Sequence, residues 1–144
     1  MVGNSLILSA TDSNKVLEIN LKSYETPIFK DLSDTAQVLG PIDYEDGAYY
    51  LCLTRKVNQF TKSGDVRHLC ALDISQTTDM PTLDRSRITG IVAFRDTAYV
   101  TTNMPGRIHR IDLKTGDSEV FVNGLNYPAH LEFLPSEMQP PETP

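Results

Sequence analysis

Short runs of apolar residues, some continuous and some alternating with polar residues, follow one another along the chain. No stretch of about 11–18 residues has apolar side chains at the i, i+3, i+4, i+7 spacing of an amphipathic helix. Clusters of Gly, Pro, Asn, Asp and Ser separate the runs, and these residues favour tight turns. The pattern therefore predicts an all-β protein of short strands joined by hairpins.

The apolar pattern also repeats. Residues 99–114 match residues 7–22 in residue type, 92 positions earlier, and a degenerate copy begins near Tyr49. This offset is two periods of about 46 residues, which is within the range of a four-stranded β-propeller blade. We therefore predict a β-propeller with about three four-stranded blades in this chain. A closed ring needs about 4–8 blades, so the chain is expected to supply half of a six-bladed ring.

The last repeat predicts the clearest blade, with strands lettered A to D from the innermost to the outermost. Its strands are expected at 88–94, 97–102, 107–112 and 118–122. Gly116, in the last hairpin turn, is free to take a positive φ. A first blade is expected to have strands B, C and D at 5–10, 15–21 and 26–30, and a second to have strands A and B at 38–44 and 48–54.

The second blade is interrupted in this interpretation. Residues 55–66 are interpreted as an insertion that turns at Ser63-Gly64, with strand C following at 67–74. Residues 77–82 match a strand poorly, so the position of strand D stays open. One more strand A is predicted at 127–134, where apolar residues return.

The predicted strands start with a strand B and finish with a strand A, so one chain can supply the strand that the first blade of another lacks. Unpaired, these strands would be exposed apolar edges prone to aggregation. We therefore predict a homodimer of half-rings with strand-swapped closure; an excerpt of a longer single-chain propeller and a different small β fold stay open. Residues 1–134 are expected to form the partial propeller, and the proline-rich segment 135–144 a tail or linker.

The third repeat resembles a known family. It contains Ile88-Thr89-Gly90-Ile91, Ala98-Tyr99-Val100, Gly106-Arg107-Ile108-His109-Arg110-Ile111-Asp112 and Thr115-Gly116. This order is similar to the NHL-type propeller repeat, and residues 124–133 resemble the start of a further blade. The superfamily includes gluconolactonase-like, paraoxonase-like and strictosidine synthase-like six-bladed propellers. The resemblance covers about residues 5–134 and implies a fold more than a function, because one fold hosts many functions.

The hydrolases of that superfamily hold a calcium ion at the ring centre, bound by Glu, Asn and Asp at the starts of innermost strands. Such oxygen ligands are those that calcium prefers. The corresponding positions here carry Leu39, Thr89 and Ala129, so the family's ligands are not matched. We therefore expect no cofactor, and a calcium-dependent lactonase- or esterase-like hydrolase is the alternative function.

The favoured function is a non-catalytic binding or scaffold module. Propellers bind ligands mainly at the face formed by the D–A and B–C loops, where sequence variation is tolerated. No serine nucleophile elbow, HExxH, Walker or dinucleotide-binding motif is present, so no catalytic residue is assigned. The candidate ligand-binding residues, from the last D–A loop and strand A, a B–C loop and the supposed insertion, are Asn126, Tyr127, His130, Asn103, Asn58 and Phe60.

Composition narrows the class of partner. The chain has 144 residues and a net charge of −6, without a basic run, so nucleic acid is not expected as a partner. No apolar run approaches the about 18 residues of a membrane helix, and no signal peptide is recognised. We therefore expect no membrane association and a cytoplasmic location by default. The ligand itself, protein or small molecule, is not identified.

Some potentially reactive residues have simpler interpretations. Cys52 and Cys70 fit no metal-binding spacing and are expected to be reduced core thiols, although a disulfide within the blade stays open. His109 is expected to be a solvated or packing residue. The acidic cluster at 43–46 is interpreted as a solvated hairpin, and Arg87 as part of a solvated loop.

Overall fold

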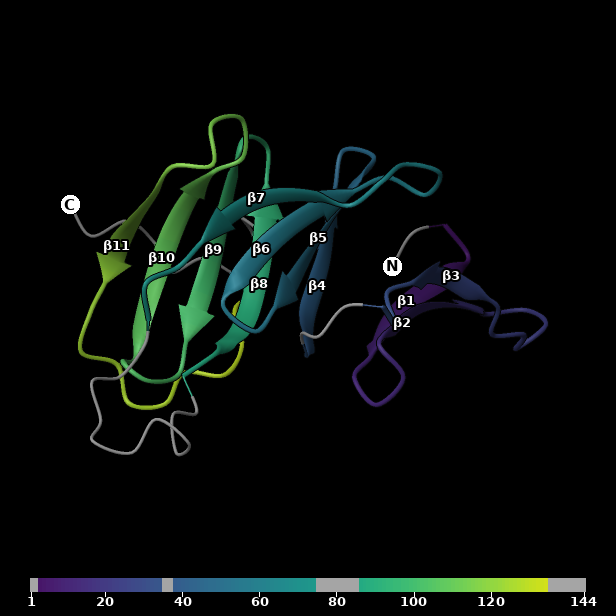
Figure 1. The fold of residues 1–144 in the computed structure, drawn as a ribbon, viewed down its shortest axis with the longest axis horizontal. Helices are drawn as coiled ribbons and strands as arrows, with labels where there is room; N and C mark the ends of the chain where they lie inside the picture. Colours follow the sequence, from purple (N-terminus) through teal and green to yellow (C-terminus); the bar gives the residue numbers. More distant parts are fainter. Residues whose placement is uncertain (1–2, 35–37, 75–85, 135–144) are drawn as a thin grey trace.

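The computed structural model describes residues 3–34, 38–74 and 86–134, and every regular element within them is a β-strand. Eleven strands in these ranges form three antiparallel sheets, each a meander in chain order (Figure 1). The sheets resemble propeller blades and lie side by side in chain order, with β1 next to β4 and β4 next to β8. Within the described residues, no helix is long and apolar enough to cross a membrane.

The strands of the three sheets, here called blades 1 to 3, have the following bounds. Blade 1 contains β1 (Ser5–Ala10), β2 (Lys15–Asn20) and β3 (Ile28–Asp31). Blade 2 contains β4 (Leu39–Glu45), β5 (Ala48–Leu53), β6 (Lys56–Phe60) and β7 (Arg67–Ala71). Blade 3 contains β8 (Ile88–Phe94), β9 (Thr97–Thr102), β10 (Arg107–Asp112) and β11 (Ser118–Val122). The expected strands of blade 3 are confirmed, and those of blade 1 differ by one or two residues at their ends.

Tight turns join the strands where the sequence places residues that tolerate positive φ. Asp46 (φ 48°) and Gly47 (φ 82°) form the two-residue turn between β4 and β5, and positive φ at both positions suits a twisted hairpin. Gly116 has φ 80°, as predicted. A Cβ atom at Gly116 would also lie 2.4 Å from the carbonyl oxygen of Leu69, so this turn packs closely on blade 2.

The core lies between the blades rather than inside any one of them. Successive side chains of a strand point to opposite faces, and all six residues of β5 are buried. Tyr50 and Cys52 belong to the cluster shared with blade 3. Tyr49 and Leu51 belong to the cluster shared with blade 1. The continuous apolar run of β5 thus reflects a strand covered on both faces.

The interpretation of residues 55–66 as an insertion is wrong. Leu53 is opposite Lys56 in the β5–β6 ladder, so Thr54 and Arg55 form a two-residue turn and β6 is the third strand of blade 2. The strand expected to be the third, β7, is the fourth. Asn58 explains the error, because this polar residue is buried in the core face of β6 and interrupts its apolar pattern. The segment 77–82 lies outside the described residues.

The strand predicted at 127–134 is not formed as a ladder, although the segment lies along β8. The Thr89 hydroxyl donates a hydrogen bond to the carbonyl oxygen of Pro128 (2.7 Å). A Cβ atom at Gly90 would lie 3.1 Å from both the carbonyl oxygen of Ala129 and the Cα atom of His130, so glycine permits this approach. A ladder needs a partner strand on the free edge, and no described strand pairs with this segment. The expected tail, 135–144, lies outside the described residues.

Candidate functional site

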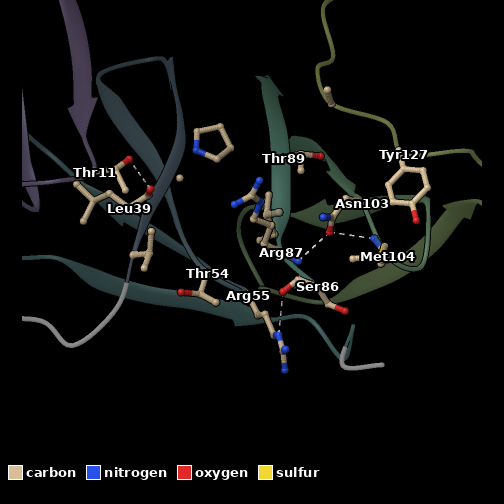
Figure 2. Close-up of a pocket in the computed structure, with 15 residues that line it drawn as sticks. Thr11, Leu39, Thr54, Arg55, Ser86, Arg87, Thr89, Asn103, Met104 and Tyr127 are labelled. Carbon is tan, nitrogen blue, oxygen red and sulfur yellow. Dashed lines mark hydrogen bonds between the residues drawn. The ribbon is translucent and has the colours of Figure 1, made fainter. Parts of the chain in front are cut away.

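A pocket of about 1070 Å³ opens on one face of the three blades (Figure 2). This face carries the β1–β2, β5–β6 and β9–β10 loops, which correspond to the B–C loop of the full blade pattern. All three of these loops contribute to its wall, as do the starts of β4 and β8 and the segment after β11. This is the D–A and B–C loop face on which the sequence places ligand binding. Its lining residues include Thr11, Val38, Leu39, Pro41, Thr54, Arg55, Ser86, Arg87, Ile88, Thr89, Asn103, Met104, Tyr127 and Ala129.

Equivalent positions of the three blades meet at this pocket. Thr11, Thr54 and Asn103 each follow directly after the second strand of the full blade pattern, in β1, β5 and β9. All three line the pocket and carry a side-chain oxygen. The repeat therefore brings together three polar side chains that are far apart in the sequence.

Hydrogen bonds between neighbouring blades hold these loops in place. The amide of Ile88, at the start of blade 3, donates to the carbonyl oxygen of Thr54 of blade 2 (3.0 Å). The Thr11 hydroxyl of blade 1 donates to the carbonyl oxygen of Leu39, at the start of blade 2 (3.1 Å). The loops of blades 1 and 2 are thus each bound to the start of the next blade.

Two lining residues have unusual backbone conformations. Thr54 has φ 55° and Tyr127 has φ 49°, both in the left-handed region. This region costs an L-amino acid about 1–2 kcal/mol, and it is especially unfavourable for a β-branched residue such as threonine. Strained residues of this kind are concentrated at binding sites and active sites. The positive φ of Thr54 belongs to the two-residue turn between β5 and β6, as in the turn of Asp46 and Gly47.

Asn103 orients one side of the pocket. Its side-chain oxygen accepts hydrogen bonds from the backbone amides of Arg87 and Met104, each at 2.9 Å. Two donors on the same oxygen fix which end of the amide is the carbonyl. Figure 2 shows both bonds at the mouth of the pocket, beside Thr89.

The pocket is locally positive in an acidic protein. Among the described residues, its lining contains Arg55 and Arg87 and neither Asp nor Glu. The Nε atom of Arg55 donates to the carbonyl oxygen of Ser86 (3.2 Å), and its side chain points away from the centre (Figure 2). Arg87 is exposed, and its side chain extends toward the middle of the pocket. Arg87 is thus solvent-exposed, as expected, and it also belongs to the pocket lining.

The structure brings together only some of the candidate ligand-binding residues. Asn103 and Tyr127 line the pocket, whereas Asn126 does not. His130 lines a separate hollow of about 340 Å³ between β4, β8 and the segment that follows Tyr127. Asn58 and Phe60 are 6% and 2% exposed. Their burial between blades 1 and 2 contradicts their assignment to an exposed binding loop.

The sequence analysis did not select Thr54, Arg55, Arg87 or Thr89 as ligand-binding candidates, although all four line the pocket. The interpretation of 55–66 as an insertion did not place a turn at Thr54 and Arg55. In the structure these two residues form the turn between β5 and β6, and both line the pocket. Thr89 and Arg87 precede or begin an innermost strand, so the blade phase could have identified both. Their positions were predictable from the repeat, but their contribution to a pocket depends on the packing between blades.

The acidic cluster at 43–46 lies in the β4–β5 hairpin, as expected, and two of its carboxylates also bond to backbone amides of blade 3. A side-chain oxygen of Asp43 accepts a hydrogen bond from the amide of Ala93 (2.6 Å), and one of Glu45 accepts from the amide of Arg95 (2.9 Å). The two carboxylates thus satisfy one donor in β8 and one in the turn that follows it. They link the innermost strands of two blades and lie outside the pocket lining.

Both cysteines are free and buried, which confirms reduced core thiols. Val57 lies between them across the sheet, opposite Cys52 on one side and Cys70 on the other. Strands two apart are separated by roughly 10 Å, which is too far for a disulfide. Burial raises the pKa of the Cys52 thiol, and raises that of Cys70 to about 11. Neither thiol is therefore poised as a nucleophile.

His109 is a packing residue, 5% exposed on the face of β10 toward blade 2. Burial lowers the pKa of its imidazole, and the nearby charge of Arg107 lowers it further. Its Nε2 atom has no hydrogen-bond partner among the described residues. The imidazole is therefore neutral in the folded protein at neutral pH.

The residues at the expected calcium positions do not fit a calcium ion. Leu39, Thr89 and Ala129 all line the pocket, but Leu39 and Ala129 have no side-chain oxygen. The Thr89 hydroxyl bonds to the carbonyl oxygen of Pro128. Calcium needs several oxygen ligands, usually carboxylates among them. In the described parts of the chain, no three His, Cys, Asp or Glu residues are grouped closely enough to hold a metal ion.

Comparisons with known proteins support the fold alone. No protein-family model and no curated protein matches the sequence. The computationally designed Ika4 protein is similar in structure, with a TM-score of 0.64 at 13% identity over 94% of this chain and 77% of that chain. The designed Ika8 protein gives 0.62 at 12% identity, over 94% of this chain and 39% of that chain. A europium-containing methanol dehydrogenase gives 0.56 at 15% identity, over 82% of this chain and 23% of that chain.

Proposed function

We propose that this chain is a non-catalytic binding module of NHL-like β-propeller type, which contacts its ligand or partner in the pocket of the D–A and B–C loop face. The pocket itself is the observation that carries the proposal, because every blade contributes to it. Among the described residues, its lining contains no Asp, Glu, His or Cys, so these residues offer no carboxylate, imidazole or thiolate as a general base. A site rich in hydrogen-bond donors and apolar surface but poor in titratable groups is suited to binding.

Nuclear magnetic resonance with a small-fragment library tests this proposal. We expect fragment binding to shift the backbone amide signals of Thr54, Asn103 and Tyr127 together, because these residues share the pocket. Tyr127→Ala should weaken binding, since its side chain is 67% exposed at the rim. Tyr24→Ala is the matched control, because Tyr24 is 78% exposed and also has a positive φ. Fragments that bind only outside the pocket would contradict the proposal.

The second part of the proposal is that two chains complete a six-bladed ring. The exposed face of blade 1 supports it. Leu6 and Leu8 are 41% and 47% exposed, although they occupy the positions of Tyr49 and Leu51, which are 6% and 0% exposed in blade 2. The pairing registers establish this equivalence, since Leu6 lies opposite Ile19 as Tyr49 lies opposite Phe60. These leucines lack only the neighbouring blade that would cover them.

The other end of the blade row exposes a matching apolar face. Tyr99 is equivalent to Tyr50, which blade 3 covers, and it packs against Phe121 and Phe133 with ring centroids 5.3 and 6.0 Å apart. Phe121 and Phe133 are 54% and 43% exposed. A second copy of the chain brings its blade 1 against this face. The segment 127–134 then lies where the innermost strand of that blade is needed.

Molar mass from light scattering tests the ring. We expect a dimer at micromolar concentration, and Leu8→Asp should convert it to a monomer because a charge would be buried between blades. Tyr24→Asp adds the same charge away from both faces and should leave the dimer intact. Deletion of 125–144 should also abolish the dimer. A monomeric wild-type chain would contradict the ring and favour an excerpt of a longer propeller, whereas a dimer that survives the deletion would contradict closure by this segment.

A further inference from the structure

We infer that the pocket binds a small organic anion, with its acidic group on Arg87 and its apolar body against the pocket wall. This inference rests on the proposed binding function and specifies the class of ligand. It is drawn from the charge of the lining, the position of the arginine and the size of the pocket.

The charge of the lining points to an anion. The whole chain has a net charge of −6, yet the described residues of the pocket lining include two arginines and no carboxylate. A concave site of one charge sign attracts ligands of the opposite sign. Salt bridges occupy Lys62, Arg110 and Lys114 elsewhere on the surface. Within the described part of the chain, no carboxylate pairs with Arg87.

Arg87 is well placed to bind an acidic group. Its backbone amide is fixed by the side chain of Asn103 (2.9 Å), so the side chain starts from a defined position. In Figure 2 it extends into the pocket, whereas Arg55 turns away and bonds to Ser86. A guanidinium group offers paired N–H donors that match the two oxygens of a carboxylate or the oxygens of a phosphate. Arg87 is therefore the anchor, and Arg55 contributes to the positive field.

The rest of the lining favours an organic body over a bare inorganic ion. Val38 and Tyr127, on the rim, are 56% and 67% exposed, and Leu39, Pro41 and Met104 line the pocket between the blades. A volume of about 1070 Å³ is at the upper end of the range for small-molecule sites. The single anchoring arginine and the acidic chain do not suit a polyanion such as nucleic acid, whose binding requires many cations.

A matched series of probes tests the inference. The probes are 4-phenylbutyrate, its neutral amide 4-phenylbutanamide, and inorganic phosphate, each titrated into the full-length protein and followed by backbone amide signals. We expect 4-phenylbutyrate to shift the signals of Arg87, Asn103 and Met104. The neutral amide should bind about tenfold more weakly, because a charge-assisted hydrogen bond is lost. Binding of the carboxylate should also weaken at high salt, because salt screens an exposed ion pair.

Two arginine variants locate the interaction. Arg87→Gln should lower the affinity for 4-phenylbutyrate about tenfold and leave that for the neutral amide unchanged. Arg67→Gln is the control, because Arg67 lies on β7, outside the pocket, and bonds to the exposed side of Gln59 (2.7 Å). It removes the same charge from the chain and should leave both affinities unchanged.

The outcomes separate the inference from the proposed function. Equal binding of the carboxylate and the amide in the pocket would overturn the inference and support the binding function. An unchanged affinity in Arg87→Gln would also overturn it. Phosphate binding as tight as that of 4-phenylbutyrate would refute the organic body. If all probes shifted signals only outside the pocket, both the inference and the proposed function would fail, and no binding at millimolar concentration would refute the ligand class.

Discussion

Truncation of Phe60 distinguishes its structural position from the ligand-contact role that the sequence indicates. Phe60 is 2% exposed and stacks on Tyr49, with ring centroids 5.3 Å apart and an interplanar angle of 17°. Phe29 of blade 1 lies near both rings, with its centroid 6.2 Å from that of Phe60 and 4.9 Å from that of Tyr49. Phe60→Ala would therefore open a cavity in the core that joins blades 1 and 2.

The size of the effect follows from these contacts. Truncation of a buried phenylalanine to alanine costs about 3–5 kcal/mol in the free energy of unfolding. The aromatic contacts with Tyr49 and Phe29 place Phe60→Ala in the upper part of that range, since such a pair contributes about 0.5–1.5 kcal/mol beyond burial. A loss of about 4 kcal/mol lowers the melting temperature of a chain of this length by roughly 8–16 °C.

Urea unfolding followed by circular dichroism measures the change, because the chain has no tryptophan for fluorescence. Tyr24→Ala removes a comparable aromatic ring from the surface, where it is 78% exposed, and should change stability by less than about 0.5 kcal/mol. A loss below about 1 kcal/mol in Phe60→Ala, well under the range for a buried phenylalanine, would refute the core position. Reduced fragment binding at unchanged stability would restore the original assignment of Phe60 to the ligand site.

Two further predictions concern buried titratable groups. Cys52 and Cys70 should not react with a thiol-specific reagent at pH 8 in the native state, because burial raises the pKa of both thiols. Both should react in denaturant. Rapid labelling of the native protein would contradict their buried position. The pKa of His109 is lowered in the folded state. As the pH falls through the pKa of the unfolded state, near 6.5, the unfolded protein binds a proton that the folded protein does not. The free energy of unfolding therefore decreases as the pH falls below this value. Urea titrations should show that His109→Gln reduces this dependence, and equal slopes in the wild type and His109→Gln would refute the argument.

Much of the fold could be predicted because the repeat and the strand pattern agree. The strands of blade 3 match the expected bounds, since Ile88–Phe94 is a short apolar run and strong turn residues separate the strands. The prediction for blade 2 was wrong at β6, where the buried Asn58 interrupts the apolar face of the strand. The burial of a polar residue in a core face can be recognised only when its neighbours in space are known. The prediction of a strand at 127–134 was wrong for a different reason. A strand in a sheet needs a partner strand, and no described residue provides one for this segment.

The site was less predictable because its position and its chemistry come from different sources. The repeat places Thr11, Thr54 and Asn103 at equivalent points, so their convergence on one face follows from blade geometry. Their residue types are not set by the blade pattern, since a turn that only connects two strands does not need threonine at φ 55°. Arg87 likewise contributes nothing to the buried clusters of the core. Where the fold does not require the residue type found at a repeat position, we expect contact with a ligand to explain that residue type. Substitutions of Arg87 and Thr54 test this expectation most directly.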